Sequence, residues 1–339
     1  MKHVKESPLP WQHRPIAALQ QQLFCIELVQ SCTDLIDELQ RERGLSQLAL
    51  SPQAESYAAA LREQVRLSTE AEQLLRDKLL QLETWPDVGG ASMHDLVRSG
   101  LALLHSPGLA DLVVMRQRVL LLQCSREQAF EAYCALLAQL LALVATARAA
   151  LGDAELEQEL ATLEQLMLAK EYSGQERATG CGLLASGQHD AQGWQYTLRL
   201  IEAQHHCAAQ FISRARPRAR QRLQQTLALE TQTELEALRQ QLAESPDWSE
   251  LDPDLCDIWF RTCSRRMNEL QQVESGLLQE MRQGLVLKLE QFALPGTLTA
   301  RAGNGKLMPA AVEAVMRTAA AWLAGDGGGP RLAPGSTAA

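Results

Sequence analysis

Apolar residues recur every three or four positions along most of this 339-residue chain, the spacing that gives an α-helix one apolar face. In the first such segment, Leu28, Cys32, Ile36 and Leu39 fall on one side of the helix. Runs rich in Val, Ile, Thr and Tyr, the residues that strands favour, are nearly absent, whereas Leu, Ala, Gln, Glu and Arg dominate. The pattern therefore predicts an all-α protein.

Short breaks in this pattern divide the chain into helices that we expect to pack as antiparallel neighbours. The expected fold is two up-and-down helical bundles that share long helices, within one domain over residues 15–292. Before it we expect an N-terminal arm (1–14), and after it a linker, one short helix (308–324) and a disordered tail, together 293–339. The predicted helices cover residues 15–50, 52–82, 93–105, 109–124, 125–151, 191–213, 219–243 and 254–292, with a further long helix that opens at Gly152 and Asp153.

The composition narrows the environment of the protein and its partners. Hydrophobic residues make up 46% of the chain but aromatic residues only 4%, so Leu and Ala must build the core. The net charge of −9 argues against a general attraction for polyanions. The N-terminus has no apolar signal region, and the most apolar stretch, Cys134 to Ala147, is too short to span a bilayer. Eight cysteines without a CxxC pattern fit small core residues in a reducing cytosol. We therefore expect a soluble cytoplasmic protein with no membrane segment.

Three glycines, Gly174, Gly180 and Gly182, interrupt a helical segment around a single arginine, Arg177. Each glycine inside a helix costs roughly 1 kcal/mol relative to alanine. Small residues let a partner helix approach closely, which would place Arg177 at a tight crossing. The alternative is a packing notch beside an exposed arginine, and the pattern alone leaves both open.

Two further arginines lie on or beside apolar stripes. Arg43 continues the stripe that ends at Leu39, so its guanidinium needs an anion, a carboxylate on a neighbouring helix, or a path to solvent at the helix end. Arg239 lies between Leu235 and Leu242 on its helical face, a position typical of an arginine at the boundary of a core. Neither pattern alone distinguishes a ligand site from an ion pair.

Other polar clusters give weaker signals. Five arginines between Arg214 and Arg222 could contact phosphates, but no aromatic residues interleave with them, and a solvated connector explains them equally well. His205, His206 and Cys207 are adjacent in a helix and point in different directions, so we expect no metal site there. The sequence carries no phosphate-binding loop, dinucleotide fingerprint or hydrolase motif. It therefore indicates no enzyme, no cofactor and no metal.

The segments LIDELQRERGLSQLAL (residues 35–50) and LAKEYSGQERATGCGLLASG (168–187) resemble the two signature segments of the bacterial nitrate- and nitrite-sensing (NIT) domain family. Their order and separation, the helical periodicity and a later ELEALR segment also fit this family. The resemblance extends over residues 15–290. It implies an all-α sensor of two helical bundles that binds nitrate or nitrite between helices and regulates genes of nitrate assimilation or respiration.

The resemblance also assigns residues to the anion site. Carried over by motif, the ligands are Arg43 and Arg177, joined by Arg239, while Glu42, Gly44, Gln175 and Glu176 shape or brace the site.

The output of such a sensor is a separate question. Described members of the family join this domain to an ANTAR domain, which binds RNA in transcription antitermination. No segment after Phe292 resembles ANTAR, which argues against RNA binding in cis. The partners implied are nitrate or nitrite and a separate output protein, with a homodimer left open. Two alternatives stay open: a ligand-independent helical interaction scaffold, and an RNA-binding antiterminator that uses the run from Arg214 to Arg222.

Overall fold

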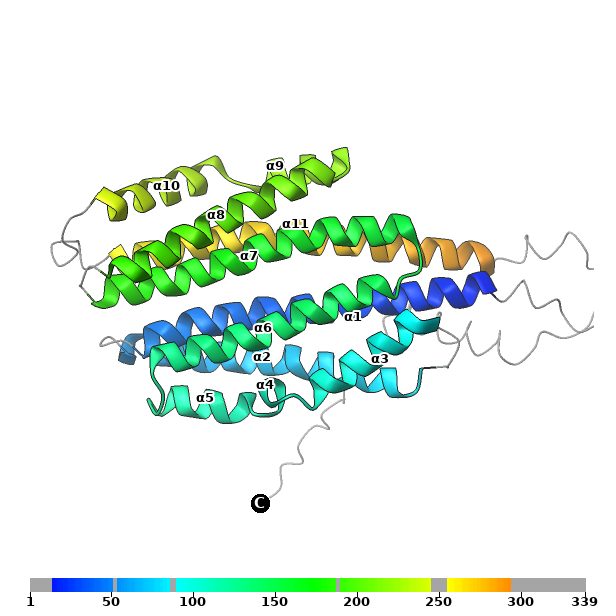
Figure 1. Ribbon diagram of the computed structural model, residues 1–339, viewed down its shortest axis with the longest axis horizontal. Coiled ribbons are helices and arrows are strands. Elements are labelled where there is room, and N and C mark those ends of the chain that lie inside the picture. Colours follow the sequence, from blue (N-terminus) through cyan, green and yellow to red (C-terminus); the bar gives the residue numbers. More distant parts are fainter. Residues whose placement is uncertain (1–13, 51–53, 86–89, 187–189, 245–254, 294–339) are drawn as a thin grey trace, which may run out of the picture. The chain divides into compact units, whose positions relative to one another are not determined.

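The computed structural model describes residues 14–50, 54–85, 90–186, 190–244 and 255–293, and every regular element in these ranges is an α-helix (Figure 1). The all-α prediction is therefore confirmed. The helices are α1 (Arg14–Ala49), α2 (Ala54–Glu83), α3 (Gly90–Leu104), α4 (Pro107–Ala110), α5 (Leu112–Leu120), α6 (Arg126–Ala149), α7 (Ala154–Ser186), α8 (Ala191–Arg214), α9 (Pro217–Thr226), α10 (Leu229–Glu244) and α11 (Leu255–Ala293).

The compact unit Met1–Leu285 contains two groups of helices, which lie one above the other in Figure 1. In the first group, α1 packs against α2 and α6, and α3 packs against the same two helices. In the second group, α7 packs against α8, and hydrogen bonds join α7 to α10 and α11. Contacts of α7 with α1 and α6 connect the groups. The long helices α1 and α7 therefore lie where the two groups meet.

Two predicted helices are each divided in two. The segment 109–124 forms α4 and α5, because Asp111 ends the first of them and begins the second. After α5 the backbone reverses at Leu122, which has a positive φ of 56°. The segment 219–243 forms α9 and α10, because Leu227 adopts an extended conformation between them. Neither interruption contains a proline or glycine that would announce it.

Two helix starts follow the sequence closely. Ser125 caps α6: its side chain accepts from the backbone N–H of Gln128, and the side chain of Gln128 accepts from the N–H of Ser125. Before α7, Gly152 has a φ of +63°, and the carboxylate of Asp153 accepts from two backbone N–H groups of the first turn. These residues set the sharp turn that places α6 and α7 side by side.

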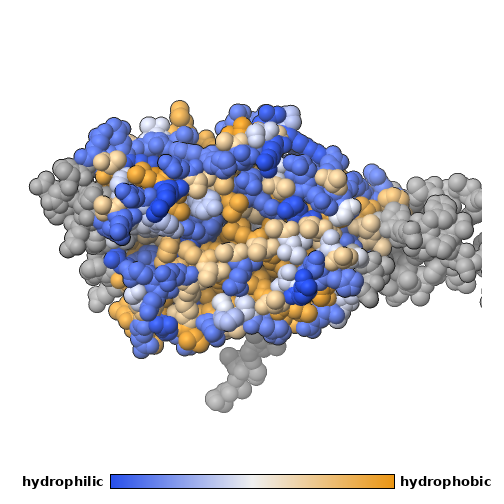
Figure 2. Space-filling model, viewed as in Figure 1, coloured by the Kyte–Doolittle hydropathy of each residue, from blue (hydrophilic) through white to orange (hydrophobic). Residues whose placement is uncertain are grey.

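Helix α6 is the one described helix that is long and apolar enough to cross a membrane, by length and composition alone. Its residues Leu136, Leu137, Leu140 and Leu143 are buried in the unit. Its exposed positions carry Glu127 and Glu131 near the start but mostly alanine from Ala132 to Ala142, and Figure 2 shows apolar side chains gathered over the middle of the face where α6 and α7 lie. The composition of this helix therefore fits a core helix with a small-residue outer face.

The remaining predictions on domain organisation lie outside the described residues. They concern the arm predicted over residues 1–14, of which only Arg14 is described and begins α1, and the linker, short helix and tail predicted over 293–339, of which only Ala293 is described and ends α11.

Candidate functional site

Helices α1 and α7 cross closely at two glycines, and each glycine faces an arginine of the other helix. A Cβ atom at Gly174 on α7 would lie 2.6 Å from Nη2 of Arg43, and one at Gly44 on α1 would lie 2.7 Å from Nη2 of Arg177. Both guanidiniums thus occupy space that a side chain at these positions would fill. The two glycines make room for two arginines at one crossing.

The glycines around Arg177 therefore have distinct roles. Gly174 makes room for Arg43 of α1, not for Arg177 of its own helix. Gly180 leaves space for the fully buried indole of Trp259, which a Cβ would overlap. At Gly182 a Cβ would meet nothing closer than 3.9 Å, so this glycine is not needed for a close approach.

Arg43 is fully buried, and Glu171 on α7 matches its charge. Nη1 of Arg43 donates to Oε1 of Glu171 at 2.6 Å and Nη2 donates to Oε2 at 3.1 Å, a bidentate pair. Nη1 also lies 3.1 Å from Sγ of Cys134. Burial is the largest influence and lowers the pKa of Arg43, but the charges and hydrogen bonds of Glu171 and Cys134 together outweigh it and raise this pKa overall. A carboxylate on a neighbouring helix was one of the alternatives that the sequence left open for Arg43.

Two glutamines complete the surroundings of Glu171. Nε2 of Gln40 donates to Oε2 at 2.9 Å, and Nε2 of Gln175 donates to Oε1 at 2.7 Å. The hydroxyl of Tyr196 in turn donates to the amide oxygen of Gln175 at 2.9 Å. Gln175, one of the predicted supporting residues, thus braces the site through Glu171.

Arg177 is also buried, with 2% of its surface exposed, but it meets no carboxylate within ion-pair distance in the part of the chain that the structure describes. Nη1 donates to Oγ of Ser264 at 2.8 Å, Nη2 donates to the backbone oxygen of Gln40 at 2.5 Å, and Nε has no partner there. The guanidinium carbon lies 4.9 Å from the ring centroid of Phe260. Burial first, and then the charge of Arg43, lower the pKa of Arg177 to about 10. Arg177 is therefore a buried cation at neutral pH, and the alternative of an exposed arginine is wrong.

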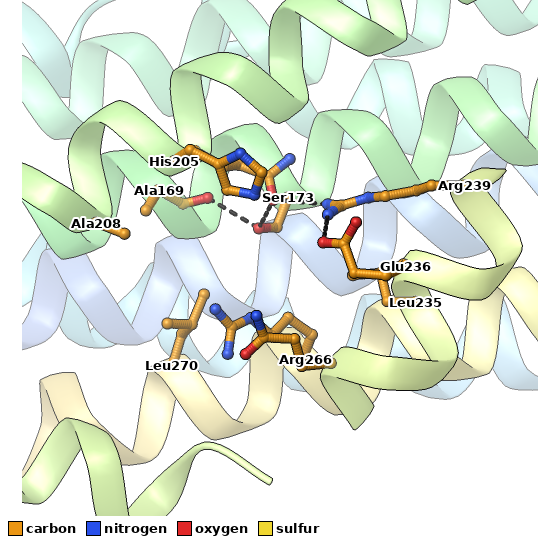
Figure 3. A pocket seen from close by; sticks show the side chains of 11 residues that line it. Ala169, Ser173, His205, Ala208, Leu235, Glu236, Arg239, Arg266 and Leu270 are labelled. Carbon is orange, nitrogen blue, oxygen red and sulfur yellow. Dashed lines mark hydrogen bonds and ion pairs between the residues drawn. The ribbon is translucent and has the colours of Figure 1, made fainter. Parts of the chain in front are cut away.

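Arg239, the third predicted ligand, lies in a separate group. Nε and Nη2 each donate to Glu176 at 2.8 Å, and Nη1 donates to Glu236 at 2.7 Å. Arg239 also lines a cavity of about 60 Å³ between α7, α8, α10 and α11, together with Ser173 and Arg266 (Figure 3). Among the described residues, it shares no hydrogen-bond partner with the two arginines at the α1–α7 crossing. Glu176, another predicted supporting residue, therefore braces Arg239.

The carboxylate of Glu42 shares no hydrogen-bond partner with Arg43 among the described residues. Its carboxylate accepts from Arg116 on α5 at 2.9 and 3.1 Å and from the hydroxyl of Tyr133 on α6 at 2.6 Å. The predicted brace at Glu42 therefore joins α1 to α5 and α6.

A second buried group of charges begins one residue before Glu171, and the sequence pattern did not predict it. Lys170 on α7 donates to both Asp37 on α1 and Glu274 on α11, and all three side chains are buried. One oxygen of each of these two carboxylates has no partner among the described residues. Burial raises the pKa of Glu274 to about 7, although Lys170 opposes this effect. The available signal was Lys170 itself, a lysine that continues the apolar helical face of Leu163, Leu166 and Met167.

The arginine run between Arg214 and Arg222 is largely neutralised by glutamates. The ion pairs are Arg216 with Glu155 and Glu159, and Arg218 and Arg222 with Glu280. The ion pairs favour a solvated run over a phosphate site, although only Arg216 lies in the connector, since Arg214 ends α8 and Arg218 to Arg222 belong to α9.

The fold is that of an all-α domain, and at the crossing of α1 and α7 Arg43, Arg177 and Glu171 together carry one net positive charge. The chain matches the family described as nitrate and nitrite sensing (NIT) over residues 34–282, and it belongs to this family. The family resemblance seen in the sequence is therefore confirmed.

Known relatives agree with this assignment. The chain is 27% identical over 251 residues to the nitrate regulatory protein of Klebsiella oxytoca, a match that covers 73% of this chain and 60% of that protein. The chain thus spans less than two thirds of the length of this relative. The structure of the present chain is similar to that of the NasR transcription antiterminator, with a TM-score of 0.71 and 24% identity. The match covers 82% of this chain and 73% of the other. This likeness supports the fold.

Proposed function

We propose that this chain is a cytoplasmic, non-enzymatic sensor of nitrate or nitrite that regulates nitrate assimilation or respiration genes, and that one anion binds where Arg43 and Arg177 meet. The observation that carries the proposal is Arg177, a buried cation without a carboxylate partner in the described part of the chain. An unpaired charge in a protein interior is costly, and a bound anion removes that cost. The family description supports nitrate and nitrite as the anions.

The charges at the crossing favour a monovalent ligand. The two arginines and Glu171 together leave one net positive charge. Nitrate and nitrite carry one negative charge, are planar, and only accept hydrogen bonds, so they suit the planar donor fork of arginine. Arg239 stays in the proposal as a third residue, because its partner Glu176 directly precedes Arg177 on α7.

The size of the ligand limits the affinity. Nitrate has four heavy atoms, and at the ceiling for very small ligands these provide roughly 6 kcal/mol, a Kd of some tens of micromolar. We therefore expect binding in the micromolar to millimolar range.

Anion binding would alter the packing of α7 against two other helices. Arg177 contacts Gln40 on α1 and Ser264 on α11, so an anion that attracts its guanidinium changes both contacts. Helix α11 then carries the change to a separate output protein or to a second copy of the chain. The anion is not transformed in this process.

Calorimetry with nitrate, nitrite, chloride and sulfate tests the proposal. We expect heat of binding and a thermal shift with nitrate or nitrite, and the loss of both in Arg43→Gln and Arg177→Gln with the helical circular dichroism retained. Arg218→Gln is the matched control, because Arg218 is largely exposed and makes only a long ion pair of 3.2 Å. No response of the wild-type protein to millimolar nitrate or nitrite would refute the proposal.

A further inference from the structure

Glu171 occupies the position of an anion within the protein. Its two oxygens accept four hydrogen bonds, two from Arg43 and one each from Gln40 and Gln175. A carboxylate is planar and presents two acceptor oxygens. Nitrite also has two oxygens, and nitrate is planar with three. The donors at the crossing are thus already arranged for a planar oxyanion, and one such group is attached to α7 itself.

The two arginines at the crossing share this internal anion unequally. Arg43 holds both oxygens of Glu171, whereas Arg177 makes hydrogen bonds to a hydroxyl and a backbone oxygen only. Gln40 connects the two, because its amide donates to Glu171 and its backbone oxygen accepts from Arg177. The negative charge of Glu171 therefore balances one arginine and leaves the other unbalanced.

We infer that Glu171 determines the charge of the anion that this site accepts, because it leaves one unbalanced positive charge; the inference rests on the proposed function. With Glu171 ionised, a monovalent anion neutralises the crossing. A divalent anion such as sulfate would leave an excess negative charge in a buried site, which is costly. Without the charge of Glu171 the crossing carries two positive charges and suits a divalent anion.

The test compares nitrate with sulfate in wild-type protein and in Glu171→Gln by calorimetry and thermal shift. The wild type binds nitrate and not sulfate. In Glu171→Gln the affinity for sulfate relative to nitrate rises by about tenfold or more, because a full charge is removed close to the ligand. Glu164→Gln is the matched control: it removes the same charge from α7, where Glu164 pairs with Arg148 at 2.7 Å, and leaves the preference of the wild type unchanged.

A second variant keeps the test decisive if Glu171→Gln does not fold. Arg43→Gln combined with Glu171→Gln replaces the buried ion pair with two neutral amides, a change that protein interiors often tolerate. Arg177 then supplies the single positive charge, so the double variant prefers nitrate over sulfate as the wild type does, whereas Arg43→Gln alone binds neither anion.

The outcomes separate this inference from the proposed function. Nitrate binding by the wild type, with sulfate still excluded from a folded Glu171→Gln, overturns the inference and leaves the proposed function standing. Sulfate binding by the double variant also overturns the inference. A wild type that binds neither nitrate nor nitrite overturns the proposed function instead, and sulfate binding gained in Glu171→Gln would still support the role of Glu171.

Discussion

The guanidinium of Arg177 lies directly against Gly44: a Cβ on Gly44 would lie 2.7 Å from Nη2 and 2.9 Å from both Cζ and Nε of the guanidinium. Arg177 is held in this position by hydrogen bonds to Gln40 and Ser264 on two different helices. The guanidinium therefore cannot withdraw without breaking a contact to one of them.

Gly44→Ala is expected to lower the free energy of unfolding by roughly 1–3 kcal/mol, the usual cost of adding a methyl group to a packed interior. It should also weaken nitrate binding, because Arg177 has to move. Urea unfolding and calorimetry measure the two effects. Gly182→Ala is the control: a Cβ there meets nothing closer than 3.9 Å, so helix propensity alone predicts equal or slightly greater stability. Equal losses in the two variants would contradict the close packing at Gly44.

Arg177→Gln and Arg239→Gln are expected to change stability in opposite directions. Arg177 lacks a carboxylate partner among the described residues, so its removal relieves a buried charge and should raise the stability of the ligand-free protein by about 1 kcal/mol or more. Arg239→Gln instead leaves the buried carboxylate of Glu176 without its bidentate partner and should cost about 3–5 kcal/mol. Urea unfolding without nitrate gives both values. A large loss of stability in Arg177→Gln would show that its charge is already balanced.

The stability of the protein is expected to fall between pH 5 and pH 7 through Glu274. Burial raises the pKa of Glu274 from its ordinary value of 4.5 to about 7, so the folded protein binds more protons than the unfolded chain in this interval. The contribution to stability is complete below pH 4.5 and is lost as the pH rises through 7.

Glu274→Gln keeps the shape of the protonated side chain and should reduce the decline between pH 5 and pH 7. It should also make the protein more stable than the wild type at pH 8. In the wild type Lys170 then faces two buried ionised carboxylates, Asp37 and Glu274, whereas in the variant it faces one. Urea unfolding at several pH values checks the slope. Identical slopes in the two proteins would mean that Glu274 titrates outside this interval.

The arginine run from Arg214 at the end of α8 to Arg222 in α9 is expected to bind RNA only weakly. Three of its five arginines pair with glutamates, which leaves little free positive charge for phosphates. Fluorescence anisotropy with labelled RNA should therefore detect no salt-dependent binding, and replacing Arg214 and Arg220 with Gln should change nothing. Binding that is strong at low salt and disappears in this double variant would favour the RNA-binding alternative.

The sequence allowed most helices to be predicted, because leucine and alanine recur at helical spacing from α1 to α11. It did not show the interruptions at Asp111 and Leu227, since both lie in segments without proline or glycine. In those segments tertiary packing bends a chain that local preference would keep helical.

The site was predictable in its parts but not in its pairing. The motif around Arg177 and the stripe that leads to Arg43 singled out both arginines, but the pattern left open whether they are buried. Which carboxylate balances which arginine depends on distances between helices, so the role of Glu171 and the isolation of Arg177 were visible only in three dimensions. The same holds for Lys170, whose two partners lie 133 and 104 positions away in the chain.

Arg43 and Glu171 are separated by 128 positions, and each arginine at the crossing fits only against the glycine of the other helix. The proposed anion site therefore needs both helices: a chain that ends before α7 lacks Glu171 and Arg177, and under the proposed function it would not bind the anion.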